Sequence, residues 1–139
     1  MSAAKYRHES ERWFSAAEDD LRSANVLSEA GQCAHACFHC QQAAEKALKA
    51  LHFQLGGDPW GHSVKKLIDD LVSLDTDAHA SFASLNVSAV KLDRFYIPTR
   101  YPDGMPELTT NAVYYKEDVE EGLVFAENIL KAVVRLKKG

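Results

Sequence analysis

The chain has few residues of the kinds that cross-link or interrupt a fold. It contains three cysteines, four prolines and seven glycines among 139 residues. The cysteines, Cys33, Cys37 and Cys40, lie too close together along the chain to build a disulfide framework, and an odd number suits a reducing compartment. We therefore expect all three to be free thiols.

Long apolar runs and an excess of positive charge are also missing. No run approaches the roughly 18 apolar residues that a membrane span requires, and the N-terminal segment lacks an apolar signal region, so we expect a cytoplasmic protein without membrane contact. The formal net charge is −4, whereas broad adhesion to duplex nucleic acid depends on an excess of Lys and Arg on one surface. A small basic pocket remains compatible with this charge.

Several common catalytic patterns are absent. The sequence has no G-x-S-x-G elbow, no glycine-rich phosphate loop and no Glu-x-x-His pairs for a di-metal centre. The cluster Cys33, His35, Cys37, His39 and Cys40 contains good zinc ligands, but on a helix the three thiols share one face while His35 points elsewhere. We therefore expect neither a metal nor a cofactor, and interpret the thiols as small core residues.

What the chain does contain is a run from residue 33 to residue 55 with neither Gly nor Pro. Small or apolar residues recur there at the three-and-four spacing of a core-facing helix. They are Cys33, Cys37, Cys40, Ala44, Ala47, Leu51 and Leu55. The opposite face carries Gln41, Gln42, Glu45, Lys46 and Lys49. That face is either ordinary solvated surface or the wall of a polar site.

Four further segments have helical patterns. They span residues 10–30, residues 64–74 after a Ser63 cap, residues 75 or 77 to 96, and roughly 28 residues from Thr109 or Thr110. The short link at Gly31 predicts an antiparallel hairpin of the first two helices. Since no strand pattern or repeat is found, we expect one domain over residues 1–139, an all-α antiparallel up-and-down bundle of four to five helices.

A combination of polar positions carries a family resemblance. Gln41 to Ala50 reads Gln-Gln-Ala-Ala-Glu-Lys-Ala-Leu-Lys-Ala, His62 follows it, and the loop Ile-Pro-Thr-Arg-Tyr-Pro-Asp stands at residues 97–103. This set resembles the HEPN domain family over about residues 10 to 135. The resemblance implies a helical bundle, usually a homodimer, that is associated with nucleotide or RNA binding and often works with a minimal nucleotidyltransferase partner.

Many relatives of this kind are toxin-like RNases, but the sequence departs from their motif. Those members have an Arg followed, after four to six residues, by a His. Here neither Arg94 nor Arg100 has a His downstream, because His79 is the last histidine in the chain. RNA cleavage without a metal needs a general acid or base, and His is the usual one. The resemblance therefore favours binding over catalysis.

We predict a ligand-binding site from residues that suit a nucleotide or RNA. Arg100 could hold a phosphate with its planar guanidinium, Lys46 and Lys49 add point charges, and Tyr96 and Tyr101 offer faces for stacking a base. The complete predicted set is Gln42, Lys46, Lys49, His62, Arg94, Tyr96, Arg100, Tyr101 and Asp103.

Each of these residues also has an ordinary structural use. Lys46 and Lys49 could lie on a solvated helix face, Tyr101 could pack on the bundle, and Arg100 could pair with a carboxylate to hold its loop. Two further hypotheses stay open beside ligand binding. The first is a degenerate RNase that uses Arg100 with His62 or Tyr101, and the second is a dimeric protein-interaction module without a ligand.

Overall fold

The computed structural model of the protein describes residues 1–96 and 113–138. These residues form helices and no strands, which confirms the prediction of an all-α bundle. Three long helices dominate: α1 (Ala3–Glu29), α2 (Cys33–Gln54) and α7 (Lys116–Lys138). Shorter helices lie between them: α3 (Val64–Asp70), α4 (Thr76–Ser81) and α5 (Asn86–Asp93), with 3-10 turns at Leu71–Ser73 and Ala83–Leu85.

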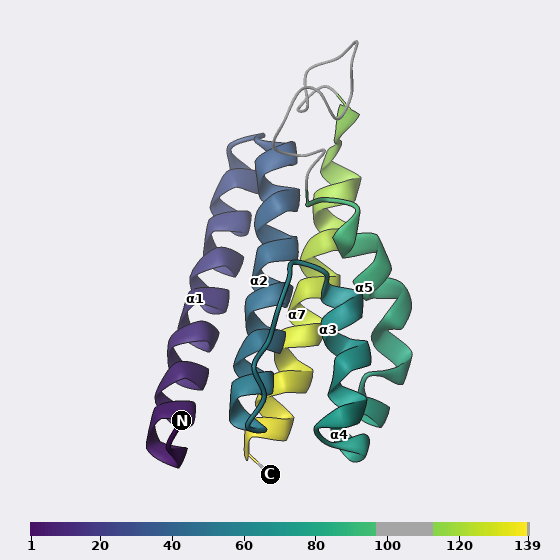
Figure 1. The fold of residues 1–139 in the computed structure, drawn as a ribbon. Coiled ribbons are helices and arrows are strands. Elements are labelled where there is room, and N and C mark those ends of the chain that lie inside the picture. Colours follow the sequence, from purple (N-terminus) through teal and green to yellow (C-terminus); the bar gives the residue numbers. More distant parts are fainter. Residues whose placement is uncertain (97–112, 139) are drawn as a thin grey trace.

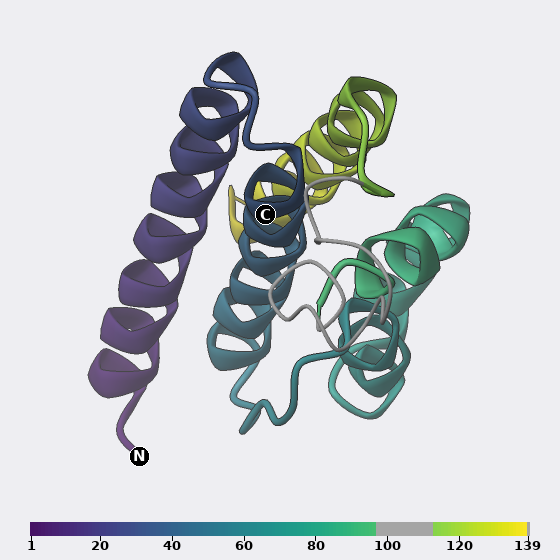
Figure 2. The same ribbon diagram turned by 90° about the horizontal axis from the view of Figure 1, so that it is seen from above.

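The helix α2 lies at the centre of the molecule (Figure 1), with α1 on one side and α7, α3 and α5 on the other. Gly31 joins α1 to α2 and has a φ of +77°, a left-handed conformation that glycine adopts at little cost. The two helices form the antiparallel hairpin that the short link predicts. Figure 2 shows the same arrangement from above, with α2 between α1 and the shorter helices.

The predicted small-residue stripe on α2 is buried. Cys37, Cys40, Ala44, Ala47 and Leu51 have no exposed surface, and small side chains at these positions let neighbouring helices approach closely. One such approach is at Gly122 of α7, where an added Cβ would lie 3.4 Å from the Cys40 sulfur.

The number of helices and several boundaries differ from the sequence prediction. The described residues contain six α-helices rather than four to five. The predicted third helix ends at Asp70 and continues as a 3-10 turn, and α7 begins at Lys116 rather than at Thr109 or Thr110, because Tyr114 and Tyr115 are not helical. The first helix begins at Ala3 rather than Ser10, because Ser2 caps it by accepting a hydrogen bond from the Lys5 amide at 3.2 Å. The predicted fourth helix is broken into α4 and α5 by a 3-10 turn. This turn redirects the chain so that Phe82 before it and Leu92 after it both reach the core, which a periodic apolar pattern alone does not reveal.

Other predicted caps are confirmed. The Ser63 hydroxyl accepts a hydrogen bond from the Lys66 amide at 3.0 Å, and Asp75 accepts one from the Ala78 amide at the same distance. The predicted cap at Thr109 or Thr110 lies outside the described residues. None of the described helices combines the length and the apolar character that a membrane crossing needs.

Candidate functional site

The polar face of α2 is not ordinary solvated surface. Gln41 has no exposed area, and Glu45 and Lys49 expose only 3% and 8% of theirs. These three residues are spaced by four along the helix, so they form one row on α2. Buried polar groups must find partners or they cost free energy. The contacts of this row therefore define the candidate site.

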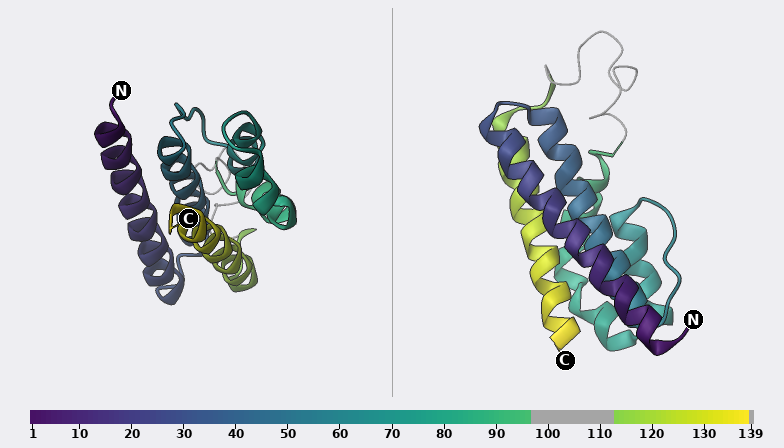
Figure 3. Two further views of the ribbon diagram at one scale, coloured as in Figure 1. Left: turned by 90° about the horizontal axis from the view of Figure 1, so that it is seen from below. Right: turned by 90° about the vertical axis from the view of Figure 1, so that its left-hand side faces the viewer.

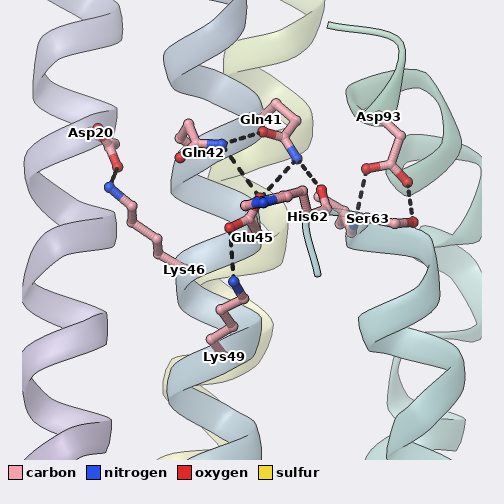
Figure 4. Close-up of polar contacts among 10 residues, drawn as sticks. Asp20, Gln41, Gln42, Glu45, Lys46, Lys49, His62, Ser63 and Asp93 are labelled. Carbon is pink, nitrogen blue, oxygen red and sulfur yellow. Dashed lines mark hydrogen bonds and ion pairs between the residues drawn. The ribbon is translucent and has the colours of Figure 1, made fainter. Parts of the chain in front are cut away.

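Glu45 lies at the centre of these contacts (Figure 4). One carboxylate oxygen lies 3.1 Å from the Lys49 ammonium nitrogen, and the other lies 3.4 Å from the His62 Nδ1. The Gln41 and Gln42 amides each donate to the second oxygen at 3.4 Å. A buried carboxylate is thus partnered by a cation, an imidazole and two amides.

Gln41 also anchors the loop that carries His62. Its amide nitrogen donates a hydrogen bond to the His62 carbonyl oxygen at 2.7 Å, and its oxygen accepts one from Gln42 at 2.7 Å. The backbone at residue 62 is therefore held against α2 by a buried side chain. The His62 ring itself stays 59% exposed, so it is fixed in place and open to solvent.

An aromatic stack adjoins this polar row through His62, which contacts Glu45. The His62 ring lies nearly parallel to the Tyr96 ring with centres 4.8 Å apart, and Phe38 stacks on Tyr96 at 6.2 Å. Tyr96 follows α5, whereas Phe38 belongs to α2, so the stack joins two parts of the bundle. Because Tyr96 is the last described residue before position 97, the stack also marks where the predicted Arg-Tyr-Pro loop begins.

Asp93 fixes the relative position of α3 and α5. Its carboxylate accepts hydrogen bonds from the Val64 amide at 2.7 Å, the Lys65 amide at 3.1 Å and the Ser63 hydroxyl at 2.8 Å. The first turn of a helix offers free amide groups that favour a negative charge. Asp93 supplies that charge from the end of α5, and so holds His62 and Tyr96 near each other.

Lys46 lies on the neighbouring side of α2 and faces α1. Its ammonium nitrogen is 2.7 Å from an Asp20 carboxylate oxygen, and His39 Nδ1 hydrogen bonds the other Asp20 oxygen at 2.9 Å. Burial raises the pKa of Asp20, but the hydrogen bond with His39 and the Lys46 ammonium outweigh it and leave that pKa below its usual value. Beside this pair a recess of about 260 Å³ is lined by Arg12, Trp13, Ala16 and Lys46.

The structure brings together four of the predicted site residues and separates others. Gln42, Lys49 and His62 meet at Glu45, and Tyr96 stacks on His62. Lys46 pairs with Asp20 instead, and Arg94 is exposed at the end of α5. The predicted residues Arg100, Tyr101 and Asp103 lie outside the described residues, so their approach to α2 stays a prediction.

Five residues that make contacts in or beside the candidate site are not among the predicted ligand-binding residues. They are Glu45, Gln41, Phe38, Asp93 and Asp20. The spacing of Gln41, Glu45 and Lys49 by four residues was a usable signal, because it places three polar side chains in one row. The roles of Phe38 and Asp20 had no such signal, since their contacts involve residues distant in the chain.

Among the described residues no group of three or more His, Cys, Asp or Glu side chains is placed to hold an ion. Burial raises the pKa of the Cys40 thiol to about 12 and also raises that of Cys37, which disfavours the thiolates that bind zinc.

Comparison with known proteins agrees with the fold. The HEPN domain profile matches residues 10–137. A Methanocaldococcus jannaschii protein named as a candidate toxin is 29% identical over 122 residues, which cover 84% of this chain and 80% of that protein.

Solved structures of similar fold also include HEPN proteins. A Thermus thermophilus protein is 39% identical with a TM-score of 0.77 over 91% of this chain and 96% of its own. An archaeal HEPN homologue is 34% identical with a TM-score of 0.71 over 92% and 97% of the two chains. A Thermotoga maritima HEPN domain protein is 31% identical with a TM-score of 0.69 over 90% and 96%. The chain therefore belongs to the HEPN domain family.

Proposed function

We propose that this HEPN domain binds a nucleotide or a segment of RNA beside the His62–Tyr96 stack. The observation that carries the proposal is that the His62 ring is both held in place and exposed. Its side chain is 59% exposed, and its ring centre lies 4.8 Å from that of Tyr96. Gln41 holds its backbone carbonyl and Glu45 contacts its Nδ1. Bases stack favourably on such faces whatever their sequence. A preorganised ring also loses little conformational entropy when a ligand arrives.

The phosphate would be held by Arg100, as the family resemblance suggests. Arg100 follows Tyr96 by four positions, and an extended chain of that length spans at most about 14 Å. The guanidinium could therefore contact a phosphate attached to a base on the His62 ring. Lys49 and Lys46 would contribute through the field of the site rather than by direct contact, because each already pairs with a carboxylate.

The binding proposal is tested by calorimetry with ATP and with a short single-stranded RNA. We expect Arg100→Ala and His62→Ala to weaken binding about tenfold or more, since a charge-assisted phosphate contact and a stacked base each contribute roughly 1–3 kcal/mol. Lys66→Ala is a matched control, because Lys66 is exposed and its ion pair in the described part of the chain is with Asp70. Absence of binding at millimolar ligand, with the protein folded, would refute the proposal.

As implied by the family, we further propose that the domain acts as a homodimer with a minimal nucleotidyltransferase partner. A toxin-like role is supported by the relative from M. jannaschii that is named as a candidate toxin. Light scattering of the pure protein tests the dimer. Co-purification with a small nucleotidyltransferase encoded next to this gene tests the partner. A monomeric protein in solution would contradict the dimer, and failure to co-purify with that nucleotidyltransferase would contradict the partner.

RNA cleavage is a second candidate, favoured by the contact between His62 Nδ1 and Glu45 Oε1 at 3.4 Å. A carboxylate in this position orients an imidazole so that the other ring nitrogen faces outward, which is how a general base is commonly held. Incubation of the protein with total RNA in the presence of chelator tests it. Cleavage lost in both His62→Ala and Arg100→Ala supports this function, and intact RNA with the wild-type protein excludes it.

A further inference from the structure

A groove runs between α1 and α7 on the outside of the bundle. It has a volume of about 480 Å³, and its lining is mostly apolar. Its floor consists of Phe14 and Leu21 from α1 with Leu130 and Val134 from α7. A shallower recess of about 360 Å³ shares Phe14 and Val134 and extends the groove toward Glu11 and Lys137.

The groove lies away from the candidate ligand site. Figure 3 shows α1 and α7 beside α2, with α3 and α5 on the far side of the bundle from α1. On α1 the groove residues Phe14 and Leu21 alternate with Trp13 and Asp20, which face Lys49 and Lys46 of α2. A function of this groove is therefore independent of the proposed nucleotide site.

The two walls of the groove carry opposite net charge. The α1 wall presents Glu11 and Glu18 together with Arg22, which pairs with Asp19 on the same helix. The α7 wall presents the three cations Lys131, Arg135 and Lys137 and one carboxylate, Glu127. Lys131 and Arg135 are exposed and make no ion pair with the residues that the structure describes. The Lys137 ammonium lies 4.8 Å from the centre of the Phe14 ring, so a cation borders the apolar floor directly.

From these features we infer that the groove binds an amphipathic helix of another protein, with carboxylates along the side that faces α7 and cations along the side that faces α1. Groove residues on α1 run from Glu11 to Asn25, a helical length of about 21 Å. A helix of about 14 residues has that length, and its apolar stripe would cover the floor.

A single helix fits this groove better than a second copy of the same face. Two concave faces placed together would leave their floors apart, and protein interfaces tolerate little empty volume. One helix is convex and can fill the space between α1 and α7. Because the two walls differ in net charge, each charged flank of such a helix can face a wall of opposite sign.

The test uses fluorescently labelled peptides of about 18 residues, long enough to cover the groove and hold a helix when bound. One peptide has a leucine stripe with Glu on one flank and Lys on the other. A control of the same composition has its leucines scrambled around the helix. Fluorescence anisotropy is expected to show binding of the first peptide to the wild-type protein and at least about tenfold weaker binding of the control.

Charge reversal then locates the binding face. We expect the double variant K131E/R135E to bind the mixed peptide about fivefold or more weakly, since two rim attractions become repulsions. A peptide with Lys on both flanks should show the reverse preference and bind this variant more tightly than the wild-type. The variant K5E/K116E has the same net charge with its changes outside the groove, and should bind the mixed peptide within about twofold of wild-type.

Three outcomes would overturn the inference. They are equal binding of the mixed and scrambled peptides, equal effects of the two charge-reversed variants, and a wild-type dimer that K131E/R135E converts to a monomer while the peptides do not bind. The last outcome would assign the groove to a second copy of the chain. Circular dichroism of each variant shows whether the fold is retained, and both pairs of substitutions are at exposed positions.

Discussion

Glu45 is the residue on which the polar contacts of α2 converge. Its side chain is 3% exposed and that of Lys49 is 10% exposed, so the ion pair between them is shielded from water. Removing one partner of a buried pair leaves the other charge uncompensated, which typically costs several kcal/mol. The contribution of such a pair to stability is therefore measured by removing one of its two charges by substitution.

We expect Glu45→Gln to lower the free energy of unfolding by about 2–4 kcal/mol, because Lys49 keeps a buried charge without a carboxylate. Urea denaturation measures this change. The control Glu120→Gln removes a pair with Lys116 in which both side chains are more than half exposed, and should cost less than about 0.5 kcal/mol. Equal, small effects of the two substitutions would mean that the Glu45 pair is not shielded.

His52 predicts a pH dependence of stability. Its Nε2 lies 2.8 Å from the Leu67 carbonyl oxygen, so this nitrogen donates the hydrogen bond. Burial lowers the pKa of His52, and the bond to Leu67 offsets only part of this. Since the folded-state pKa lies below the unfolded value of about 6.5, the unfolded chain takes up the proton first, and stability falls as the pH drops below that value.

The variant His52→Gln should lose this dependence, because the amide can donate to Leu67 and does not titrate. Chemical denaturation at pH 7.5 and pH 5 compares the two proteins. We expect the wild-type protein to lose more stability than the variant between these values. A wild-type loss no larger than that of the variant would show that the His52 proton does not control stability in this range.

At the scale of elements, Asp93 joins α5 to the start of α3. Asp93→Asn retains the size of the side chain but replaces one acceptor oxygen with an amide group that cannot accept from the Val64 or Lys65 amides. We expect a loss of about 1–2 kcal/mol, the usual cost of a helix cap. Hydrogen exchange of these amides should also accelerate more than exchange in α1.

A matched control for Asp93 is Asp69→Asn, in the same region but at an exposed position where it pairs with Lys65. This change should cost less than about 0.5 kcal/mol. If both variants exchange alike at the start of α3, the cap does not hold the two elements together.

Element boundaries show where sequence patterns succeed and fail. The burial of the α2 stripe, the cap at Ser63 and the turn at Gly31 follow from local spacing and turn chemistry, and were predicted. The break between α4 and α5 was not, because Phe82, Ala89 and Leu92 keep helical spacing across the 3-10 turn. Only packing against α3 and α7 shows that the chain must change direction there.

At the scale of the whole molecule, Asp20 connects α1 to the centre of the bundle through Lys46 and His39. Its folded-state pKa is lowered, so its contribution to stability is complete above the unfolded value of about 3.9 and is lost as the pH falls through the folded pKa. Acid should therefore weaken the attachment of α1 to α2.

We expect acid unfolding, followed by circular dichroism from pH 5 to pH 2, to be less steep in Asp20→Asn than in the wild-type protein. The asparagine variant should be less stable at pH 5 and should differ less from wild-type at pH 2, where Asp20 is protonated. The exposed neighbour Asp19, which pairs with Arg22, provides the control Asp19→Asn. An identical acid transition in all three proteins would contradict the role of Asp20.

The amino-acid sequence by itself determined the helical class, the core-facing stripe of α2 and the HEPN family, since these depend on periodicity, capping residues and a local motif. It also marked Gln42, Lys49, His62 and Tyr96 as candidate site residues. Only the tertiary structure decided that the polar face of α2 is buried and that Lys46 pairs with Asp20 rather than facing a ligand. The physical reason is that burial and ion pairing depend on which helix covers a face, and that is set by contacts between residues distant in the chain.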